Sequence, residues 1–302
     1  MKSEIIYHHN SGGRSGHVLK DIFTSVILGE LFGLTATYGK AWEKQKLLPV
    51  ENVQRLLPRP TIDLKSHQLC LPNKKCQWDG ISFREVETLR QQVANVPGRV
   101  RFELSGVTRI HLSQVHCWET QGLVAEGVYD HLLLRLKQMY WGPSVPCFDL
   151  PGQISKVVIH VRRGDVARQG HPMYRSMGPG LWSKTFYQKE IDKIRKRFPR
   201  CRIRMLTERS NSGDLDGLRG VVLDRGGTES IDQHFRQMIE ADLFMPANSG
   251  LSTWAAHLSR GRIWMTANKI KHYEFAHPPK KWLQSSELPQ IESTARQKRH
   301  SS

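Results

Sequence analysis

Hydrophobic and polar positions along the chain follow two periods in turn, and this predicts strands that are followed by helices. The segment EIIYHHN is typical of a short first strand, and SGGRSGH follows it as a glycine-rich turn. After the turn, apolar residues recur at helical spacing along one face. These residues are Val18, Leu19, Ile22, Phe23, Val26, Ile27, Leu31 and Phe32. With LTATYG as a second strand, the pattern predicts a β–turn–α–β unit that opens a doubly wound domain.

The rest of the N-terminal half is less regular. Residues 47 to 79 are rich in Pro, Lys and Asn and show little periodicity, so we expect a loop or an insertion there. Beyond it, SFREVETLRQQVANV predicts a helix, RVRFEL and VTRIHL predict strands, and LVAEGVYDHLLLRLKQMYW predicts a long amphipathic helix. The segment GPSVPCFDLPGQ carries three prolines and two glycines, which is typical of a linker.

The alternation then starts again. Strand patterns occur at KVVIHV, CRIRMLT, GVVLD, ADLFMPA and RIWMT, and helix patterns lie between them. Strands that alternate with helices indicate a second parallel α/β domain. We therefore predict an α/β protein with two Rossmann-like, doubly wound domains facing across a cleft. Residues 1–150 would form the first domain, residues 151–280 the second, and residues 281–302 a basic flexible tail.

Composition narrows the class of partner but not the fold. The chain has 302 residues and a formal net charge of +17, which favours nucleic acid, an anionic membrane or a phosphorylated small molecule as partner. The longest apolar segment, His17 to Leu34, contains Lys20, Asp21 and Glu30, so it does not predict a membrane span. The opening MKSEIIYHH lacks the apolar core of a signal peptide. We expect a soluble, cytoplasmic protein.

The five cysteines give no metal or redox motif. Cys70, Cys76, Cys117, Cys147 and Cys201 are scattered, and no pair has the spacing of a zinc knuckle or a redox CxxC. Reduced, buried thiols are the expectation, with a Cys70–Cys76 bridge as the alternative in an oxidising compartment.

The segment HVRRGD follows a predicted strand and carries two arginines. Strand alternation over Val157 to Val161 puts His160 and Arg162 on one side of the sheet and Arg163 on the other. Arginine is suited to bidentate phosphate binding, and Asp165 can cap the turn or orient an arginine. The pattern therefore predicts a phosphate-binding arginine, with a simple salt bridge at the strand end as the alternative. An integrin-type RGD signal is disfavoured because the tripeptide adjoins a buried strand.

A second candidate anion site lies in ADLFMPANSGLSTWAAHLSRG. A strand runs into Asn248, Ser249 and Gly250, and a helix follows. Either Asn248 or Ser249 can cap this helix, and the amides and positive dipole at a helix N-terminus favour an anion. The alternative is an ordinary helix cap without a ligand.

Three further segments are weaker signals. The turn GGRSGH matches neither a Walker loop nor GxGxxG. Asp214 and Asp216 form an Asp-x-Asp pair, which holds a metal in some sugar transferases, but here the pair lies in a Ser/Gly loop. The run KIRKRFPRCRIR is typical of a solvated helix face, since no aromatic residues interleave for base stacking.

Taken together, these motifs resemble a known family. HVRRGD resembles the His-x-Arg-Arg-x-Asp signature of the α1,6/α1,2 and protein O-fucosyltransferase superfamily. SGGRSGH occupies the place of that family's N-terminal glycine turn, and MLTE lies where the family has a strand ending in Thr-Asp. SIDQHF with ADLFMPANSG resembles its Asp-x-His-Phe…Ala-Asp-Phe…Ser-Ser segment. The resemblance is ordered from Ile154 to Thr266 and patchy from Leu47 to Gln153.

The resemblance implies a GT-B fold and an inverting, metal-independent transfer of fucose from GDP-fucose to a glycan, with no cofactor. It implies that Arg162 grips the β-phosphate and that His160 and Asp232 lie at the guanine. Phosphate would be held by Ser249 and Ser252. The pyrophosphate and the sugar would lie against Gly13, Arg14 and Gly16.

The general base is open. Some α1,6 relatives carry a glutamate a few residues after the motif, whereas VARQGHP has no carboxylate. The catalytic candidates beside Arg162 are Asp165, His171 and Glu208, and an oxocarbenium-like transition state can also need little help from a base. The alternative functions are a glycosyltransferase for another sugar nucleotide and a basic module that binds nucleic acid or another polyanion.

Overall fold

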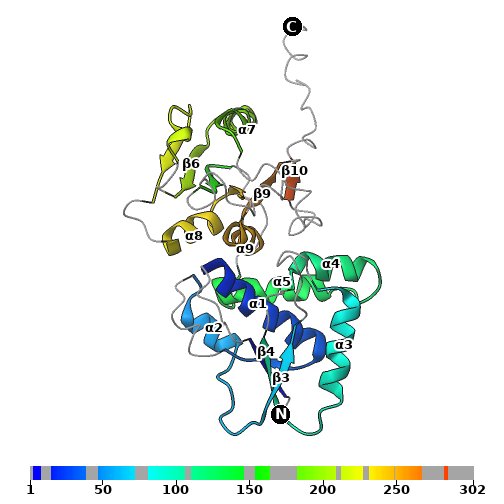
Figure 1. Ribbon diagram of the computed structural model, residues 1–302. Helices are drawn as coiled ribbons and strands as arrows, with labels where there is room; N and C mark the ends of the chain where they lie inside the picture. Colours follow the sequence, from blue (N-terminus) through cyan, green and yellow to red (C-terminus); the bar gives the residue numbers. More distant parts are fainter. Residues whose placement is uncertain are drawn as a thin grey trace, which may run out of the picture.

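The protein consists of two parallel β-sheets, each packed with helices (Figure 1). The structure is a computed structural model that describes residues 3–7, 15–38, 47–71, 81–105, 110–145, 154–163, 182–208, 212–226, 231–247, 249–266 and 282–284. The architecture confirms the predicted α/β class with two halves that are each built on a parallel sheet.

The N-terminal domain is built on a four-stranded sheet in the order β2-β1-β4-β3, with every described pair of strands parallel. Its strands are β1 (Glu4–Tyr7), β2 (Thr35–Ala36), β3 (Ser66–Cys70) and β4 (Arg101–Ser105). Its helices are α1 (Ser15–Phe32), α2 (Val50–Leu56), α3 (Phe83–Ala94), α4 (Leu112–Thr120) and α5 (Val128–Trp141).

Three sequence predictions in this domain were wrong. The stretch predicted as a loop over residues 47 to 79 contains α2 and β3, and these elements are too short to show a clear period. The predicted strand VTRIHL is not a strand over its described residues, because α4 begins at Leu112. The long helix predicted from Leu123 begins instead at Val128, because Gly127 takes a φ of 86°, which a helix cannot continue.

Helix α3 agrees with its sequence signals. Ser82 is the N-cap and accepts a hydrogen bond from the backbone N–H of Glu85 at 3.3 Å. The Glu85 carboxylate in turn accepts from the Ser82 backbone N–H at 2.7 Å. This reciprocal capping box satisfies amide groups that the first helical turn leaves unpaired, and so it fixes where the helix begins.

The C-terminal domain is built on a six-stranded parallel sheet in the order β10-β9-β8-β5-β6-β7. Its strands are β5 (Lys156–Val161), β6 (Arg202–Thr207), β7 (Val222–Asp224), β8 (Leu243–Met245), β9 (Arg262–Met265) and β10 (Trp282–Gln284). Its helices are α7 (Lys184–Arg197), the short 3-10 helix η3 (Gly213–Leu215), α8 (Ile231–Ile239) and α9 (Gly250–Leu258). Counted from β5, this is the 3-2-1-4-5-6 order of dinucleotide-binding domains.

The boundary predicted for the basic tail needs a correction. Strand β10 lies within residues 281–302, and Trp282, Leu283 and Gln284 pair in parallel with β9. Trp282 and Leu283 are two apolar residues in a polar segment, which is too short a pattern to predict a strand. The strand is recognised only by its pairing with β9 at the edge of the sheet. The other residues of the predicted tail lie outside the described part of the chain.

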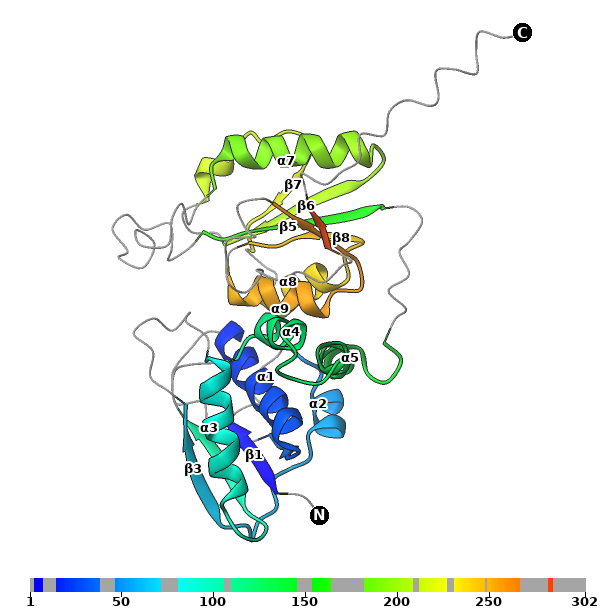
Figure 2. The same cartoon turned by 90° about the vertical axis from the view of Figure 1, so that its right-hand side faces the viewer.

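Helices cover the C-terminal sheet on both faces. Helix α7 lies on the face that points away from the N-terminal domain, and α8 and α9 lie on the face toward it (Figure 2). The strand alternation agrees with this arrangement. Val157, Ile159 and Val161 pack in the cluster that includes α7, while Val158 packs in the cluster that includes α8 and α9.

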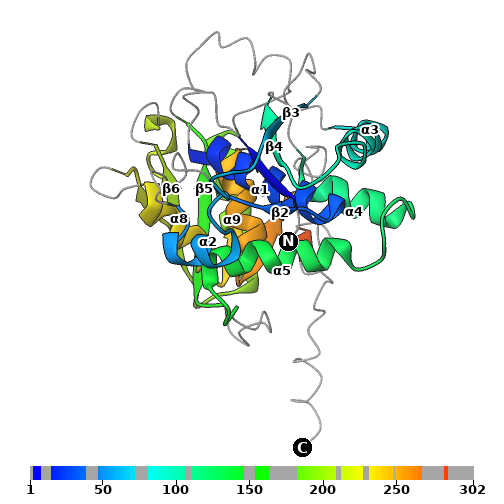
Figure 3. The ribbon, with the colours of Figure 1, turned by 90° about the horizontal axis from the view of Figure 1, so that it is seen from below.

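The two domains share one hydrophobic core. Helices α1 and α5 of the N-terminal domain overlie α9 of the C-terminal domain (Figure 3). The rings of Phe23 and Trp254 lie 4.0 Å apart, and the Trp141 indole N–H donates to the Leu258 carbonyl at 2.9 Å. The buried residues of α1, α5, α8 and α9 belong to a single cluster. Opening the molecule here would therefore expose apolar surface to water.

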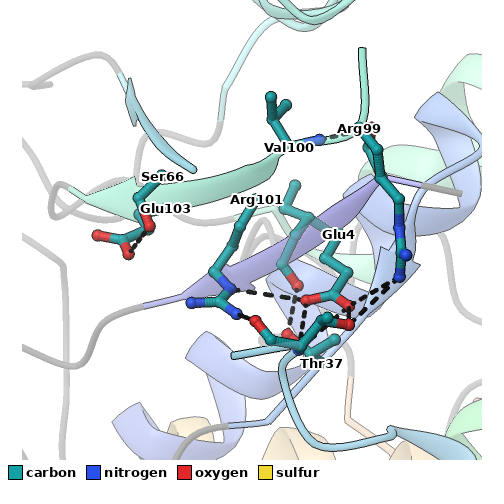
Figure 4. Close-up of polar contacts among 10 residues, drawn as sticks. Glu4, Thr37, Ser66, Arg99, Val100, Arg101 and Glu103 are labelled. Atoms are coloured by element: carbon teal, nitrogen blue, oxygen red, sulfur yellow. Dashed lines mark hydrogen bonds and ion pairs between the residues drawn. The ribbon is translucent and has the colours of Figure 1, made fainter. Parts of the chain in front are cut away.

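The buried carboxylate of Glu4 stabilises the N-terminal sheet at the amino ends of its strands. Glu4 accepts a hydrogen bond from the Thr61 backbone N–H at 3.1 Å. Arg99 and Arg101 form ion pairs with Glu4 at 3.8 and 3.6 Å (Figure 4). These contacts tie the segment before β3 to the start of β1 and β4. The cluster lies at the opposite end of the strands from their carboxyl termini, so it supports the fold.

Asp242 fixes the start of β5 against β8. Its Oδ2 accepts hydrogen bonds from the backbone N–H groups of Ser155 and Lys156 at 3.0 and 2.8 Å, and from the Ser155 hydroxyl at 2.7 Å. Burial by itself would raise the pKa of Asp242, but these hydrogen bonds outweigh burial, so the pKa lies below its usual value.

We expect Asp242→Asn to destabilise the protein at neutral pH, and we expect the effect to fade in acid. Because the folded-state pKa is depressed, the stabilisation is present above the unfolded pKa of about 3.9 and is lost as the pH falls through the folded value. Urea unfolding of both proteins between pH 7 and pH 3 measures this. A destabilisation that does not change with pH would contradict an ionised Asp242.

None of the described helices is both long and apolar enough to cross a membrane. Cys70, Cys117 and Cys201 carry free thiols, with Cys70 exposed and Cys201 buried. Cys76 and Cys147 lie outside the described residues.

Candidate functional site

The order of strands in the C-terminal sheet indicates where a ligand would bind along the carboxyl ends of the strands. From β5 the chain proceeds to β6 on one side, and from β8 it proceeds to β9 on the other. The neighbouring strands β5 and β8 therefore form the topological switch point, where open α/β sheets bind ligands beyond the carboxyl ends of the strands. The HVRR motif spans the end of β5 and the two residues after it, and the sequence ANSG follows β8.

His160 and Ser252 join the two sides of the switch point. His160 Nδ1 lies 3.0 Å from Ser252 Oγ, and both side chains are buried. Ser252 Oγ also accepts a hydrogen bond from the Ala247 backbone N–H at 2.7 Å. The Ser252 hydroxyl is thus engaged within the protein and fully buried, an arrangement that holds His160 in place.

Ser249 caps the helix that follows β8. Its side-chain oxygen accepts a hydrogen bond from the Ser252 backbone N–H at 3.2 Å, and its carbonyl accepts from the Thr253 hydroxyl at 3.0 Å. Of the two candidates for the cap, Ser249 is the one that the structure places there. The amides of the first turn of α9 therefore point toward the edge where β5 ends.

Arg162 lies just beyond the end of β5 and is oriented by Glu208. Its Nη1 donates to Glu208 Oε1 at 2.9 Å, and the side chain remains 20% exposed. Glu208 Oε2 accepts the backbone N–H of Arg163 at 2.7 Å. Glu208 follows β6, the neighbour of β5, so one carboxylate fixes both the backbone and the guanidinium at the strand end.

Arg163 points to the other face of the sheet, as the alternation predicted. It is 2% exposed and donates to both carboxylate oxygens of Asp214, at 3.1 and 2.8 Å. It also donates to the carbonyls of Trp182 and Arg162 at 2.9 and 3.1 Å and lies over the ring of Tyr187. Its guanidinium is used entirely inside the protein, so the two arginines of the motif have different surroundings.

The Asp-x-Asp pair is bonded to arginines. Asp214 is held by Arg163, and Asp216 accepts from Arg225. Within the part of the chain that the structure describes, no group of three or more His, Cys, Asp or Glu side chains could hold a metal ion. In this arrangement Asp214 ties η3 to the residue after β5, and Asp216 ties the end of η3 to the residue after β7.

The remaining predicted residues are placed only in part. Asp232 lies in the first turn of α8 and is partly buried. Gly16 is the second residue of α1. Gly13, Arg14, Asp165 and His171 lie outside the described residues, so the structure does not bring them to the site or separate them from it.

Two neighbours of the site depend on the pairing of β5 with β6. The sequence offers Glu208 as a candidate base, but its pairing with Arg162 across two strands requires the sheet register. Thr207 directly precedes it, is buried, and makes no hydrogen bond through its hydroxyl to any described residue. The register of β5 and β6 sets Thr207 beside Val161, one residue before Arg162.

Comparisons with known proteins give a likeness to solved structures alone. No protein-family model matches the chain, and no curated protein matches it. A solved structure of the fucosyltransferase FUT1 from Arabidopsis thaliana, a mutant in complex with GDP, aligns with a TM-score of 0.43 at 10% sequence identity. The alignment covers 87% of this chain and 70% of that one.

Proposed function

We propose that this chain is a glycosyltransferase that moves fucose from GDP-fucose to a glycan acceptor, with inversion at the sugar and without a metal ion. The observation that carries the proposal is the switch point of the C-terminal sheet. There, Arg162 follows β5, and the capped N-terminus of α9 follows β8. A guanidinium and a set of helix amides at one edge suit a diphosphate.

The proposed chemistry needs such groups. When the bond between the sugar carbon and the β-phosphate oxygen breaks, GDP leaves with an additional negative charge. Groups that are already oriented toward this developing charge lower the barrier, and such preorganised electrostatics can be the largest catalytic contribution. In the proposal, Arg162 and the first turn of α9 stabilise the leaving diphosphate, and Glu208 keeps the guanidinium aimed.

The roles of the other residues follow the resemblance and remain part of the proposal. His160 and Asp232 would lie at the guanine, Ser249 at a phosphate, and Gly13, Arg14 and Gly16 at the pyrophosphate and sugar. Because the Ser252 hydroxyl is engaged with His160 and Ala247, we assign Ser252 to positioning His160. Asp165, His171 or Glu208 would serve as the base that accepts the acceptor's proton, unless the transition state needs none.

Isothermal titration with GDP, in the presence and absence of EDTA, tests the proposal. We expect saturable GDP binding that EDTA does not change. Absence of GDP binding would refute the proposal, and a strict metal requirement would refute the metal-free mechanism. Binding of UDP in place of GDP would favour another sugar nucleotide. Salt-sensitive DNA binding without GDP binding would favour a polyanion-binding module. A screen of GDP-fucose transfer onto a glycan panel then identifies the acceptor.

A further inference from the structure

Helix α7 presents a row of lysines on the outer surface of the C-terminal domain. Lys189, Lys193 and Lys196 follow one another at spacings of four and three residues, which places them on one face of the helix. The side chains that α7 buries lie on its other side, against the sheet, and are Tyr187, Glu190, Ile191 and Ile194. The three lysines therefore point to solvent, and all three are exposed.

Most of the positive charge on this face is not neutralised by the protein. Lys189 and Lys196, together with the exposed Arg200 just beyond the helix, form no hydrogen bond or ion pair through their side chains with any described residue. The negative end of the helix dipole favours cations in the last turn, but Lys189 lies in the middle of the helix, where the dipole gives no such reason. These cations are therefore available to an external anion.

The opposing charges on α7 are few. Glu190 is buried, where it pairs with Lys193 at 2.7 Å, so it neutralises that lysine and no other. On the exposed side of α7 the acidic residue is Asp192, whose carboxylate accepts a hydrogen bond from the Gln188 amide at 2.9 Å. The balance on this face remains positive, as does that of the whole chain, which has a formal net charge of +17.

The position and chemistry of this row fit a flat anionic surface. Helix α7 is the outermost layer on the side away from the N-terminal domain, so a planar partner can reach it without meeting that domain (Figure 2). Lysine ammonium groups are point charges without the fixed fork of arginine, which suits the mobile head groups of anionic lipids. A single-stranded nucleic acid would gain from aromatic side chains for stacking, and none of the residues of α7, all of them described, exposes one.

We infer that the lysine face of α7 is a docking surface for an anionic lipid bilayer, to which the protein binds peripherally. The helix would lie parallel to the membrane surface while its apolar side stays packed on the sheet. The attraction would therefore be electrostatic, with no side chain entering the hydrocarbon, and salt would weaken it. Binding of this kind needs no nucleotide, so it goes beyond the proposed function and does not depend on it.

Cosedimentation with lipid vesicles tests this inference. We expect the wild-type protein to bind vesicles of phosphatidylcholine mixed with phosphatidylserine, to ignore vesicles of phosphatidylcholine alone, and to be released by added salt. Each cation near an anionic leaflet strengthens binding about fivefold, so the double variant Lys189→Gln, Lys196→Gln should bind about 25-fold more weakly. A wild-type protein that does not bind the anionic vesicles would overturn the inference and leave the proposed function standing.

Two matched variants keep the test decisive. The double variant Lys65→Gln, Arg84→Gln removes the same charge from exposed positions on the N-terminal domain and should leave vesicle binding nearly unchanged. Asp192→Asn removes the acidic group from the lysine face and should strengthen binding about fivefold. Thermal unfolding checks that each variant folds. Equal weakening in the two double variants would assign binding to net charge alone and overturn the α7 surface. Binding of duplex DNA in preference to the anionic vesicles would overturn the lipid partner.

Discussion

Replacing Arg162 by alanine is expected to lower kcat/KM for fucosyl transfer by about 100- to 1,000-fold, the effect of losing one preorganised donor to a developing anion. The expectation follows from its place beyond the end of β5, at the switch point, with a guanidinium that Glu208 orients. Steady-state transfer rates with GDP-fucose measure it. An alanine variant with wild-type kcat/KM would remove Arg162 from the site.

Arg162→Lys should lose nearly as much as the alanine variant. Lysine keeps the charge, but it lacks the planar fork that can donate to Glu208 and to a phosphate at the same time. Arg202→Lys is the matched control, since Arg202 is exposed at the amino end of β6. It therefore lies at the end of the strands opposite to the candidate site. Full activity of Arg162→Lys would show that charge alone is sufficient.

Glu208→Gln separates the two roles open to this carboxylate. If Glu208 orients Arg162, the glutamine variant should bind GDP more weakly, because one carbonyl oxygen replaces two acceptor oxygens that now serve Arg162 and Arg163. If Glu208 is instead the general base, GDP binding should be unchanged, and kcat should fall with the loss of one limb of its pH profile.

The sequence predicted those features of the site that are determined by residues close together in the chain. The alternation of the strand separates His160 and Arg162 from Arg163, and a serine before a helical pattern predicts the cap at Ser249. Each depends on neighbours within a few positions of the chain. The strand order could not be predicted in this way, because it depends on pairing between distant segments.

The features missed by sequence reasoning depend on contacts between distant segments. The positioning role of Glu208 requires the register of β5 and β6. In the fold, α2 and β3 were missed because few residues in each are buried, which leaves too short a period to detect.

Arg163→Met is expected to destabilise the protein by about 3 kcal/mol, with the C-terminal domain affected first. Arg163 is 2% exposed, and its loss would leave the carbonyls of Trp182 and Arg162 without their donor. Removing one partner of a buried ion pair costs about 3–5 kcal/mol. We expect the lower end of this range, because Asp214 is 51% exposed and can be hydrated after the change. The thermal unfolding midpoint should fall by about 6–12 °C.

The neighbouring arginine supplies the control. Arg162→Met removes the same chemical group one residue earlier, from a side chain that is 20% exposed, so its unfolding midpoint should shift much less than that of Arg163→Met. Asp214→Asn should also have a small effect, because asparagine keeps an acceptor for Arg163. Activity should show the reverse order at permissive temperature, with Arg162→Met inactive and Arg163→Met retaining GDP binding. Strand alternation places Arg162 and Arg163 on opposite faces of the sheet, which predicts that Arg163 stabilises the fold and that Arg162 serves the ligand. Equal losses of stability in the two variants would contradict this division of roles.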